Sequence, residues 1–248
     1  MRVTFLGTNG WYDNQAGNTV CTVVECRDRY VVLDAGNGIH KLDRFLAHPR
    51  PVDLFLSHFH LDHIEGLHTI VRLDLSRGLR IFGQPGTREA LETILRQPYT
   101  VPLESMPFPV SIHELPAERA LVPYLEDALP LVHASECWGF RFEIEGRTIA
   151  YCTDTGLCDN LITLGRGVDL LITECSALSG QRRDSWPHLA PEDAVIVAER
   201  TGARQVVLVH FNASLYPTKE SRMEVQRMVS AAAKNIAVAF DDMALELP

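Results

Sequence analysis

A run of histidine and aspartate directly after an apolar segment limits, more than any other feature, the folds open to this chain. The stretch LFLSHFHLDHIEGL, Leu54–Leu67, places three histidines and one aspartate within six positions, although histidine makes up only 10 of the 248 residues. Such a run would arise by chance in on the order of one chain in a thousand. A solvated polar loop with incidental histidines therefore explains it poorly, and the rest of the chain decides whether a metal site is present. The residues concerned are His58, His60, Asp62 and His63.

Apolar β-type runs and helical segments alternate along the chain. Residues 52–57 (VDLFLS) are apolar on both faces of the expected strand, which suits a buried position. Hairpins are expected to turn at Asp28–Arg29 and at Glu145–Gly146, and Thr87 is the expected N-cap of a helix in TREALETILRQ. HKLDRFLAH and EGLHTIVRLDL have helical spacing. Because no linker or repeat interrupts this order, the pattern predicts one α/β domain over residues 1–248, with two β-sheets between layers of helices.

Four further polar residues stand where apolar strands are expected to end. His133 closes LPLVH, Asp154 closes IAYCTD, and His210 closes QVVLVH, while Glu174 closes DLLITE. Each of them alone is more often a turn or capping residue. Together with the histidine run they supply metal-ligand side chains from several strand ends, and the carboxyl ends of strands are where α/β proteins commonly place their chemistry. This convergence predicts a metal site.

The motif and the segments around it resemble the metallo-β-lactamase superfamily, whose signature H-x-H-x-D-H reads here HFHLDH, residues 58–63. Within that superfamily the chain looks most like the ribonuclease Z branch and its small phosphodiesterase relatives that lack an arm. The matching segments run nearly end to end and include FLGTNG, LDAGNG, HASECWGFRFE, DTGLCD, LITECS and HLAPEDAVIVAERTG. The resemblance implies an αββα sandwich of two mixed β-sheets between helix layers, and a metal-dependent hydrolase.

The resemblance also implies two divalent metal ions per chain. It assigns His58, His60 and His133 to one ion, assigns Asp62, His63 and His210 to the second, and makes Asp154 the bridging ligand. Imidazole and carboxylate suit Zn²⁺, with Mn²⁺ or Fe²⁺ as alternatives, because ligand type alone rarely fixes the metal. A water that bridges two such ions would have a pKa near ~7 and would supply a hydroxide nucleophile.

Three residues are expected to carry the chemistry beside the metals. In ribonuclease Z-like enzymes a glutamate after a strand orients a histidine that binds phosphate or protonates the leaving oxygen, and Glu174 and His188 stand at the matching places. The alternative is that His188 only caps the helix that begins near Pro191. Asp62 is expected to hold the attacking hydroxide as well as a metal. Asp34 in LDAGNG is expected to brace the metal loop through hydrogen bonds rather than bind metal.

Several features separate this chain from other members of the superfamily. Many β-lactamases carry a cysteine where this chain has Asp154, which disfavours lactamase activity. Ribonuclease Z enzymes that mature tRNA carry a protruding basic arm, whereas only a tight turn separates FRFEIEG from IAYCTDTG. The family's H-x-S-x-R-Y is also altered, to HFNASLY over residues 210–216. Arg182 and Arg183 could meet phosphate charge, but an exposed loop is the better account of them.

The function predicted from these features is a di-metal phosphodiesterase acting on a small phosphodiester, such as a cyclic nucleotide or cyclic phosphate. A ribonuclease Z-like tRNA 3'-processing endonuclease is the alternative. The net charge of −9 argues against a general surface that grips long nucleic acid. A thioester hydrolase would not explain Glu174 and His188, and a non-catalytic metal-binding protein would be expected to have lost ligands.

Composition and the resemblance supply the remaining expectations. The six cysteines show no C-x-x-C spacing, so free and mostly buried thiols in a cytoplasmic protein are expected. No secretory signal is recognised, and no apolar run approaches the roughly 18 residues that a membrane span needs. Because ribonuclease Z-like proteins pair, the resemblance implies a homodimer. The apolar segment LHTIVRLDL is the only local support for pairing, and a helix buried within the chain explains that segment equally well.

Overall fold

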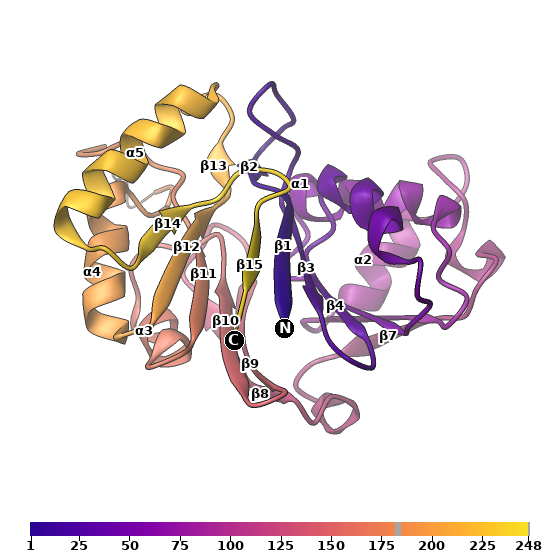
Figure 1. Ribbon diagram of the computed structural model, residues 1–248. Helices are drawn as coiled ribbons and strands as arrows, with labels where there is room; N and C mark the ends of the chain where they lie inside the picture. The colour runs from indigo at the N-terminus through magenta and orange to yellow at the C-terminus, as the bar shows by residue number, and fades with distance from the viewer. Residues whose placement is uncertain (182–184, 248) are drawn as a thin grey trace.

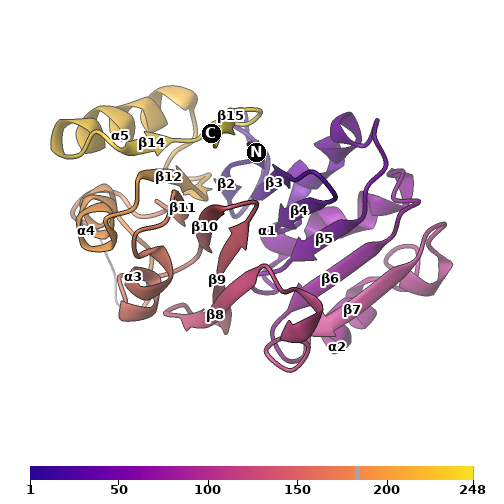
Figure 2. The ribbon, with the colours of Figure 1, turned by 60° about the horizontal axis from the view of Figure 1, so that its bottom comes forward.

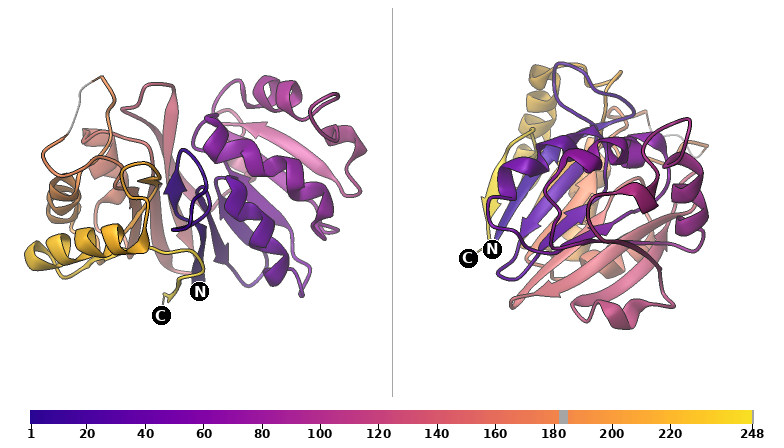
Figure 3. Two further views of the ribbon diagram at one scale, coloured as in Figure 1. Left: turned by 90° about the horizontal axis from the view of Figure 1, so that it is seen from above. Right: turned by 90° about the vertical axis from the view of Figure 1, so that its right-hand side faces the viewer.

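Two β-sheets pack face to face in the computed structural model, which describes residues 1–181 and 185–247. Helices lie on the outer side of each sheet in Figure 1, and the view from above in Figure 3 shows the same layers. Within the described residues each sheet contains both parallel and antiparallel strand pairs. The predicted sandwich of two mixed sheets between helix layers is therefore confirmed.

The first sheet comes mainly from the first half of the chain. Its strands are β1 (Arg2–Gly7), β3 (Cys21–Glu25), β4 (Tyr30–Leu33), β5 (Val52–Phe55), β6 (Leu79–Gly83), β7 (Val110–Glu114) and β15 (Ala244–Glu246), in the spatial order β15-β1-β3-β4-β5-β6-β7. Helix α2 (Thr87–Ile94) and the 3₁₀ helices η1 (Asn37–Phe45) and η2 (Glu65–Arg72) pack on its outer face through a continuous set of buried apolar side chains. Shorter 3₁₀ turns are η3 (Leu103–Ser105) and η4 (Arg119–Leu121).

The second sheet comes from the second half. Its strands are β8 (Leu125–Leu131), β9 (Cys137–Ile144), β10 (Arg147–Cys152), β11 (Leu170–Glu174), β12 (Gln205–Val209) and β14 (Ile236–Val238), in the spatial order β14-β12-β11-β10-β9-β8. Helices α3 (Asp159–Gly165), α4 (Pro191–Thr201) and α5 (Lys219–Ala232) cover its outer face. Figure 2 shows these helices on the left of the molecule. A short parallel pair, β2 (Asn9–Gly10) with β13 (Phe211–Asn212), stands apart from both sheets.

Alternate side chains of the central strands face different layers. In β10, Ile149 and Tyr151 pack between the two sheets, whereas Ala150 and Cys152 pack beneath the outer helices. Successive side chains of a strand point to opposite faces, so a strand covered on both sides must be apolar throughout. This burial explains why such strands are uninterrupted apolar runs in the sequence.

Both predicted hairpins form, and one predicted helix cap is wrong. Strands β3 and β4 pair antiparallel, and β9–β10 turns at Glu145–Gly146, whose φ angles are 53° and 76°. Two positive φ angles form the turn that matches the twist of paired strands. Helix α2, however, already includes Thr87, and its cap residue is Gly86 with φ 91°. Glycine suits that left-handed backbone better than threonine does. The Thr87 hydroxyl donates to the carbonyl of Gln84 instead (2.6 Å).

Parallel strands of both sheets end at the same edge of the molecule. Strands β4, β5 and β6 are parallel to one another, as are β10, β11 and β12. Helix α1 (Leu61–Ile64) follows β5 and β13 follows β12, and both are labelled at the upper edge in Figure 1. Loops that leave the carboxyl ends of parallel strands gather at one edge, so side chains from distant segments can meet there.

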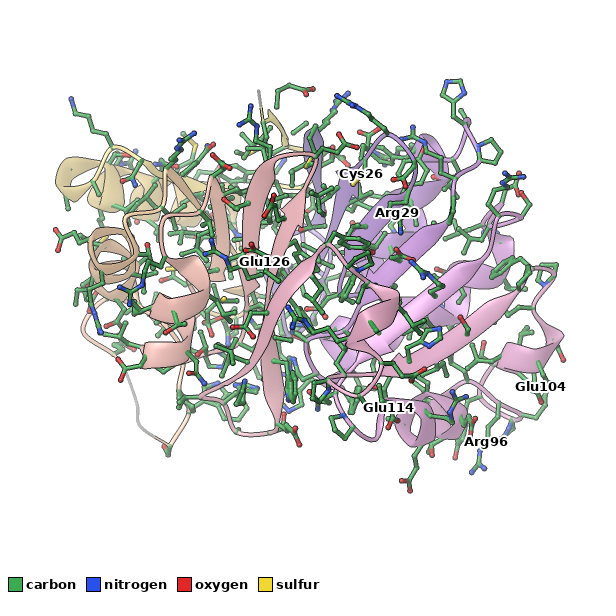
Figure 4. The ribbon with its side chains drawn as sticks, turned by 90° about the horizontal axis from the view of Figure 1, so that it is seen from below. Cys26, Arg29, Arg96, Glu104, Glu114 and Glu126 are labelled. Carbon is green, nitrogen blue, oxygen red and sulfur yellow. The ribbon has the colours of Figure 1, made fainter. Side chains whose placement is uncertain are left out.

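The buried carboxylate of Asp53 links segments of the first sheet at the end opposite to the edge where the parallel strands end. Asp53 on β5 accepts from Arg29 Nη1 (3.1 Å) and Arg80 Nε (2.6 Å), and the Tyr124 hydroxyl also donates to it. Figure 4, seen from below, shows Arg29 on this side of the molecule. A fully buried charge is tolerated only when it is paired and hydrogen-bonded, so this arrangement is structural.

The cysteines and the helices bear on two further expectations. All six cysteines are free; five are buried and Cys158 is half-buried, which confirms the prediction of free thiols. In the part of the chain that the structure describes, no helix has both the length and the apolar character needed to cross a membrane.

Candidate metal centre

The histidine run lies in the loop and the short helix that follow β5. His58 is buried in the loop, His60 is the extended cap residue of α1, and Asp62 and His63 belong to the helix itself. Because the chain turns here from strand to helix, side chains that are close in sequence come together in space. The His58 ring centroid lies 4.5 Å from that of His60 and 4.1 Å from that of His63.

Three later segments bring the remaining candidate ligands to the same place. His133 lies shortly after β8, Asp154 shortly after β10, and His210 directly after β12. Asp154 and His210 have left-handed backbone angles, with φ 51° and 52°, which turn the chain sharply at the strand end. The structure therefore brings together all the candidate ligands that the sequence suggested.

The ligand-type atoms fall into overlapping sets, within each of which they lie no more than 4.8 Å apart. The sets are His58, His60, His133 and Asp154; Asp62, His63 and His210; and Asp154, His188 and His210. The first two sets contain the residues that the resemblance assigned to the two ions.

Asp154 lies between the first two sets and directs one carboxylate oxygen to each. Its Oδ2 is 3.8 Å from the Nε2 atoms of both His58 and His133. Its Oδ1 is 3.2 Å from the Nε2 atoms of both His63 and His210. In this position the Asp154 carboxylate could be shared between two cations.

The polar atoms at the centre suit cations better than they suit one another. His58 Nε2 is buried without a hydrogen-bond partner among the described residues. The Nε2 atoms of His63 and His210 face each other at 3.1 Å, and His133 Nε2 faces His60 Nδ1 at 3.3 Å. Buried polar atoms are normally satisfied, and a divalent ion is the group that satisfies several converging imidazoles and carboxylates together. The residues present therefore fit the implied metals.

Burial sets the protonation of the first set. It lowers the pKa of His58 well below the usual value and lowers that of His60, and it lowers the pKa of His133 to about 4. These three imidazoles are therefore neutral at pH 7, which is the form that binds metal.

Charge pairing sets the protonation of the second set. Burial acts to raise the pKa of Asp154 and of Asp62, but neighbouring histidines, His63 and His210, outweigh it and hold both pKa values below the usual range. Burial acts to lower the pKa of His63, and the surrounding carboxylates, chiefly Asp154 and Asp34, raise it well above the usual value. The two candidate carboxylate ligands are thus ionised at neutral pH.

Asp34 supports the histidine run through hydrogen bonds, as the sequence suggested. Its Oδ1 accepts from the Ser57 backbone N–H (2.7 Å), and its Oδ2 accepts from the hydroxyls of Ser57 (2.8 Å) and Tyr151 (2.7 Å). Asp34 Oδ2 also lies 2.8 Å from His63 Nδ1. A carboxylate on Nδ1 fixes the ring and leaves Nε2 to face the centre.

Glu174 and His188 form a buried pair beside the candidate ligands. Glu174 Oε1 lies 2.7 Å from His188 Nδ1 and accepts from the backbone N–H of Thr155 (2.6 Å), while Oε2 accepts from that of Ser176 (3.2 Å). Burial acts to lower the pKa of His188, and Glu174 outweighs it and raises the pKa to about 9. The contact with Glu174 thus favours the protonated imidazole, which is the form that can donate a proton.

The alternative role for His188, as a helix cap, is wrong. The cap residue of α4 is Ala190, whose backbone N–H donates to Asp193 Oδ2 (3.1 Å). His188 lies before that residue and directs its Nδ1 to Glu174 instead. Arg182 and Arg183, also considered from the sequence, lie outside the described residues.

Three contributors were not found from the sequence. The Trp11 backbone N–H donates to Asp62 Oδ2 (2.6 Å), and the Ser176 hydroxyl lies 2.9 Å from His210 Nδ1. Gly10 lies against the His210 ring, where an added Cβ would come within 2.6 Å of Cε1. Ser176 follows Glu174 in the LITECS segment, which is a usable signal, whereas the contact of Trp11 is made by its backbone and leaves no trace in residue type.

A cavity of about 800 Å³ opens above these residues. Such a volume is typical of a site for a small organic ligand. Its described lining includes His60, Asp62, His133, Asp154, His188 and His210, together with Trp11, Leu61, Trp186 and Leu215.

Comparison with known proteins assigns this chain to a family. Residues 29–211, well over half of the chain, match the model of the beta-lactamase superfamily domain. The chain belongs to the metallo-β-lactamase superfamily. Hydrolases of this superfamily depend on metal, and this one has a His/Asp cluster that is able to bind it.

Its relatives lie in the ribonuclease Z-like branch. The chain is 25% identical to ribonuclease Z of Myxococcus xanthus over 100% of this chain and 98% of the relative. The crystal structure of the metallo-β-lactamase-fold protein YhfI of Bacillus subtilis has a TM-score of 0.77 at 19% identity and covers 98% of each chain. A diphosphatase of the PhnP family has a TM-score of 0.73 at 18% identity, over 100% of this chain and 98% of the other. These two structures share the fold.

Proposed function

We propose that this hydrolase is a di-metal phosphodiesterase whose substrate is a small phosphodiester, such as a cyclic nucleotide or another cyclic phosphate. The observation that carries the proposal is the buried contact between His188 Nδ1 and Glu174 Oε1 (2.7 Å), which places the imidazole beside Asp154 and His210. Hydrolysis of an unactivated diester requires a proton for the leaving oxygen, and a general acid supplies it. A non-catalytic metal-binding protein would not need this pair.

In this proposal the ligand sets hold two divalent ions, most simply Zn²⁺. The proposed ligands are His58, His60 and His133 for one ion, Asp62, His63 and His210 for the other, and Asp154 for both. When bound, such ions polarise phosphoryl oxygens and lower the pKa of a bound water to about 7. Imidazole and carboxylate also accept Mn²⁺ or Fe²⁺, so the metal is best assigned by analysis.

The chain's own residues would then position the substrate and move protons. His188 donates a proton to the leaving oxygen, and Glu174 keeps its ring in place through Nδ1. Asp62 accepts from the Trp11 N–H, which holds its Oδ2 3.2 Å from His210 Nε2. In this position the Asp62 carboxylate can accept a hydrogen bond from the attacking water and orient it.

A tRNA 3'-processing endonuclease is the second candidate because the ribonuclease Z relative matches the whole chain. Two features favour the small substrate. In the described residues, β9 and β10 are joined only by the turn Glu145–Gly146. This connection is too short to form a basic arm that binds tRNA. The net charge of −9 also opposes binding of a long polyanion.

One activity panel distinguishes these functions. Cyclic mononucleotides, nucleoside cyclic phosphates, linear dinucleotides and precursor tRNA are supplied to the protein with Zn²⁺ and with Mn²⁺. We expect hydrolysis of a cyclic substrate and little cleavage of precursor tRNA. Efficient 3' cleavage of precursor tRNA with no turnover of small diesters would favour the endonuclease. No turnover of any diester would overturn the proposal.

A further inference from the structure

We propose that Trp11 and Trp186 form a base-binding subsite at the mouth of the metal cavity. In this view the substrate is a phosphodiester that carries a planar aromatic base, which stacks on an indole while the phosphate lies at the metal centre. The inference rests on the proposed phosphodiesterase function and adds the chemical class of the group next to the phosphate.

Large apolar side chains surround the mouth of the cavity and remain exposed. Trp11 is 65% exposed, Trp186 53% and Leu61 67%, and all three line the same cavity as the candidate ligands. They come from three separate segments of the chain. Isolated exposed apolar residues are common, but several that converge on one concave site mark a place where a ligand is bound.

The backbone of Trp11 gives an independent reason to assign its ring a function. Its φ is 78°, in the left-handed region where a bulky residue is strained and glycine is favoured. The preceding Gly10 lies so close to the His210 ring that an added Cβ would clash with it, so glycine is needed at position 10. Position 11 has the strained backbone and nevertheless carries tryptophan. A side chain this exposed gains little packing within the fold. Residues held in strained conformations without a packing benefit gather at functional sites.

The two tryptophan residues adjoin different parts of the proposed metal centre. The Trp11 backbone N–H donates to Asp62 Oδ2 (2.6 Å), which fixes its position next to the second ligand set. The Trp186 ring centroid lies 6.4 Å from that of His133 in the first set and 5.6 Å from that of His188. A phosphate at the centre would therefore share one cavity with both tryptophans.

An aromatic base is the group that best fits these walls. Indole faces stack on planar rings and do so with little regard to base identity, because every base has a π-face. Leu61 beside them adds apolar surface that a sugar edge or a base edge can contact. A second copy of this chain, covering the same rings in a dimer, is the other occupant that a test must distinguish.

The test compares matched substrates and matched variants. The substrates are a nucleoside cyclic phosphate and the corresponding ribose cyclic phosphate without a base. The variants are Trp11→Gly, which also relieves the positive φ, and Trp186→Ala. Tyr99→Ala is the control, because Tyr99 is 71% exposed and does not line the cavity.

We expect the native protein to prefer the base-bearing substrate in kcat/KM by roughly 5- to 150-fold, the range that stacking of one base gives. Each tryptophan variant should lose much of this preference, mainly through KM. The rate of Trp186→Ala on the base-free substrate should stay within about twofold of the native rate. Trp11→Gly should not lower the thermal midpoint of unfolding. Tyr99→Ala should behave like the native protein.

Three results would overturn the inference. The first is equal hydrolysis of the two substrates by the native protein, which would leave the phosphodiesterase proposal intact. The second is an unchanged preference for the base-bearing substrate in both variants. If the thermal midpoint of unfolding also fell, the two rings would have a structural role. The third is conversion of a dimer to a monomer by either variant, seen by light scattering, with the preference unchanged.

A binding experiment separates this inference from the proposed function. Calorimetry on zinc-loaded protein compares a nucleoside monophosphate with ribose phosphate. If no diester is hydrolysed at all, tighter binding of the nucleoside monophosphate that is lost in the tryptophan variants still supports the subsite. Equal binding of both probes overturns it.

Discussion

At the scale of single residues, His188 is where the proposed chemistry can be separated from metal binding. It lies close enough to Asp154 and His210 to belong to a third ligand set, so its role as proton donor needs a direct test. His188→Ala should lower kcat on natural diesters by about 10²–10⁴-fold, the usual contribution of a general acid, and should leave metal content unchanged. The loss of kcat should be smaller for diesters with an acidic leaving group, such as a nitrophenyl phosphodiester.

A matched pair elsewhere in the chain serves as the control. His113 Nδ1 lies 2.8 Å from Glu118 Oε1, the same kind of histidine–carboxylate contact away from the cavity. His113→Ala should leave kcat unaltered. If His188→Ala lost metal together with activity, His188 would be a ligand, and native rates on both classes of diester would remove it from the mechanism.

Substitution of Gly10 is a second test at this scale, because an added side chain would fill the space next to the candidate ligand His210. An added Cβ would lie 2.6 Å from His210 Cε1 and 2.7 Å from its Nε2, so the ring must shift. Gly10→Ala should therefore lower the content of the second metal and the activity together, measured by elemental analysis and turnover. Full metal content in a normally active variant would show that the second ion does not depend on His210.

The candidate ligands could be predicted from the sequence, whereas some of their supports could not. The histidine run is contiguous, and His133, Asp154 and His210 each end an apolar run, which is a visible pattern. Trp11 acts on Asp62 through its backbone N–H, and any residue type has one. Contacts made by the backbone depend on how a turn is placed in three dimensions, so the residue type does not reveal them.

At the scale of elements, long apolar strands and tight turns were predictable and short or distant pairings were not. Strand β5 lies within the predicted run of residues 52–57 because that run is buried throughout. Segments with helical spacing formed the 3₁₀ helices η1 and η2, since apolar residues three apart suit either helix type. Helix α3, strand β15 and the β2–β13 pair were missed. Strand β15 pairs with β1 from the other end of the chain, so no local pattern specifies it.

The buried Asp53 gives a stability prediction for the first sheet. Asp53→Asn should lower the free energy of unfolding by about 1–3 kcal/mol, because it weakens hydrogen bonds to Arg29 and Arg80 that are made to a charged group. The loss of stability should be smaller than that for a fully buried ion pair, since both arginines are partly exposed. Denaturant titration with metal saturated is the measurement.

Glu126 is the control for this substitution. It pairs with Arg141 Nε at 2.6 Å on the second sheet, is half-exposed, and is seen from the same side in Figure 4. Glu126→Gln should cost no more than about 1 kcal/mol, as exposed pairs usually do. Equal losses for the two substitutions would mean that burial of Asp53 does not strengthen its pairing.

At the scale of the whole molecule, association remains a prediction. The segment that offered local support for pairing forms η2, and its apolar residues Leu67 and Ile70 are buried within the chain. Packing inside the chain therefore accounts for them, and the dimer rests on the resemblance to ribonuclease Z-like proteins alone. We expect light scattering at micromolar concentration to give twice the chain mass of 27.7 kDa. A particle of a single chain mass would contradict the prediction.

The central claim is that Asp154 joins two metal ions that the protein needs for hydrolysis of a phosphodiester. Elemental analysis of purified native protein and of Asp154→Ala, with diester turnover measured on the same samples, tests it most directly. We expect about two divalent ions per native chain. Asp154→Ala should lose metal from both sets and be inactive, and native activity removed by a chelator should return with Zn²⁺ or Mn²⁺. Native protein without metal, and with no gain of activity when either ion is added, would contradict the account.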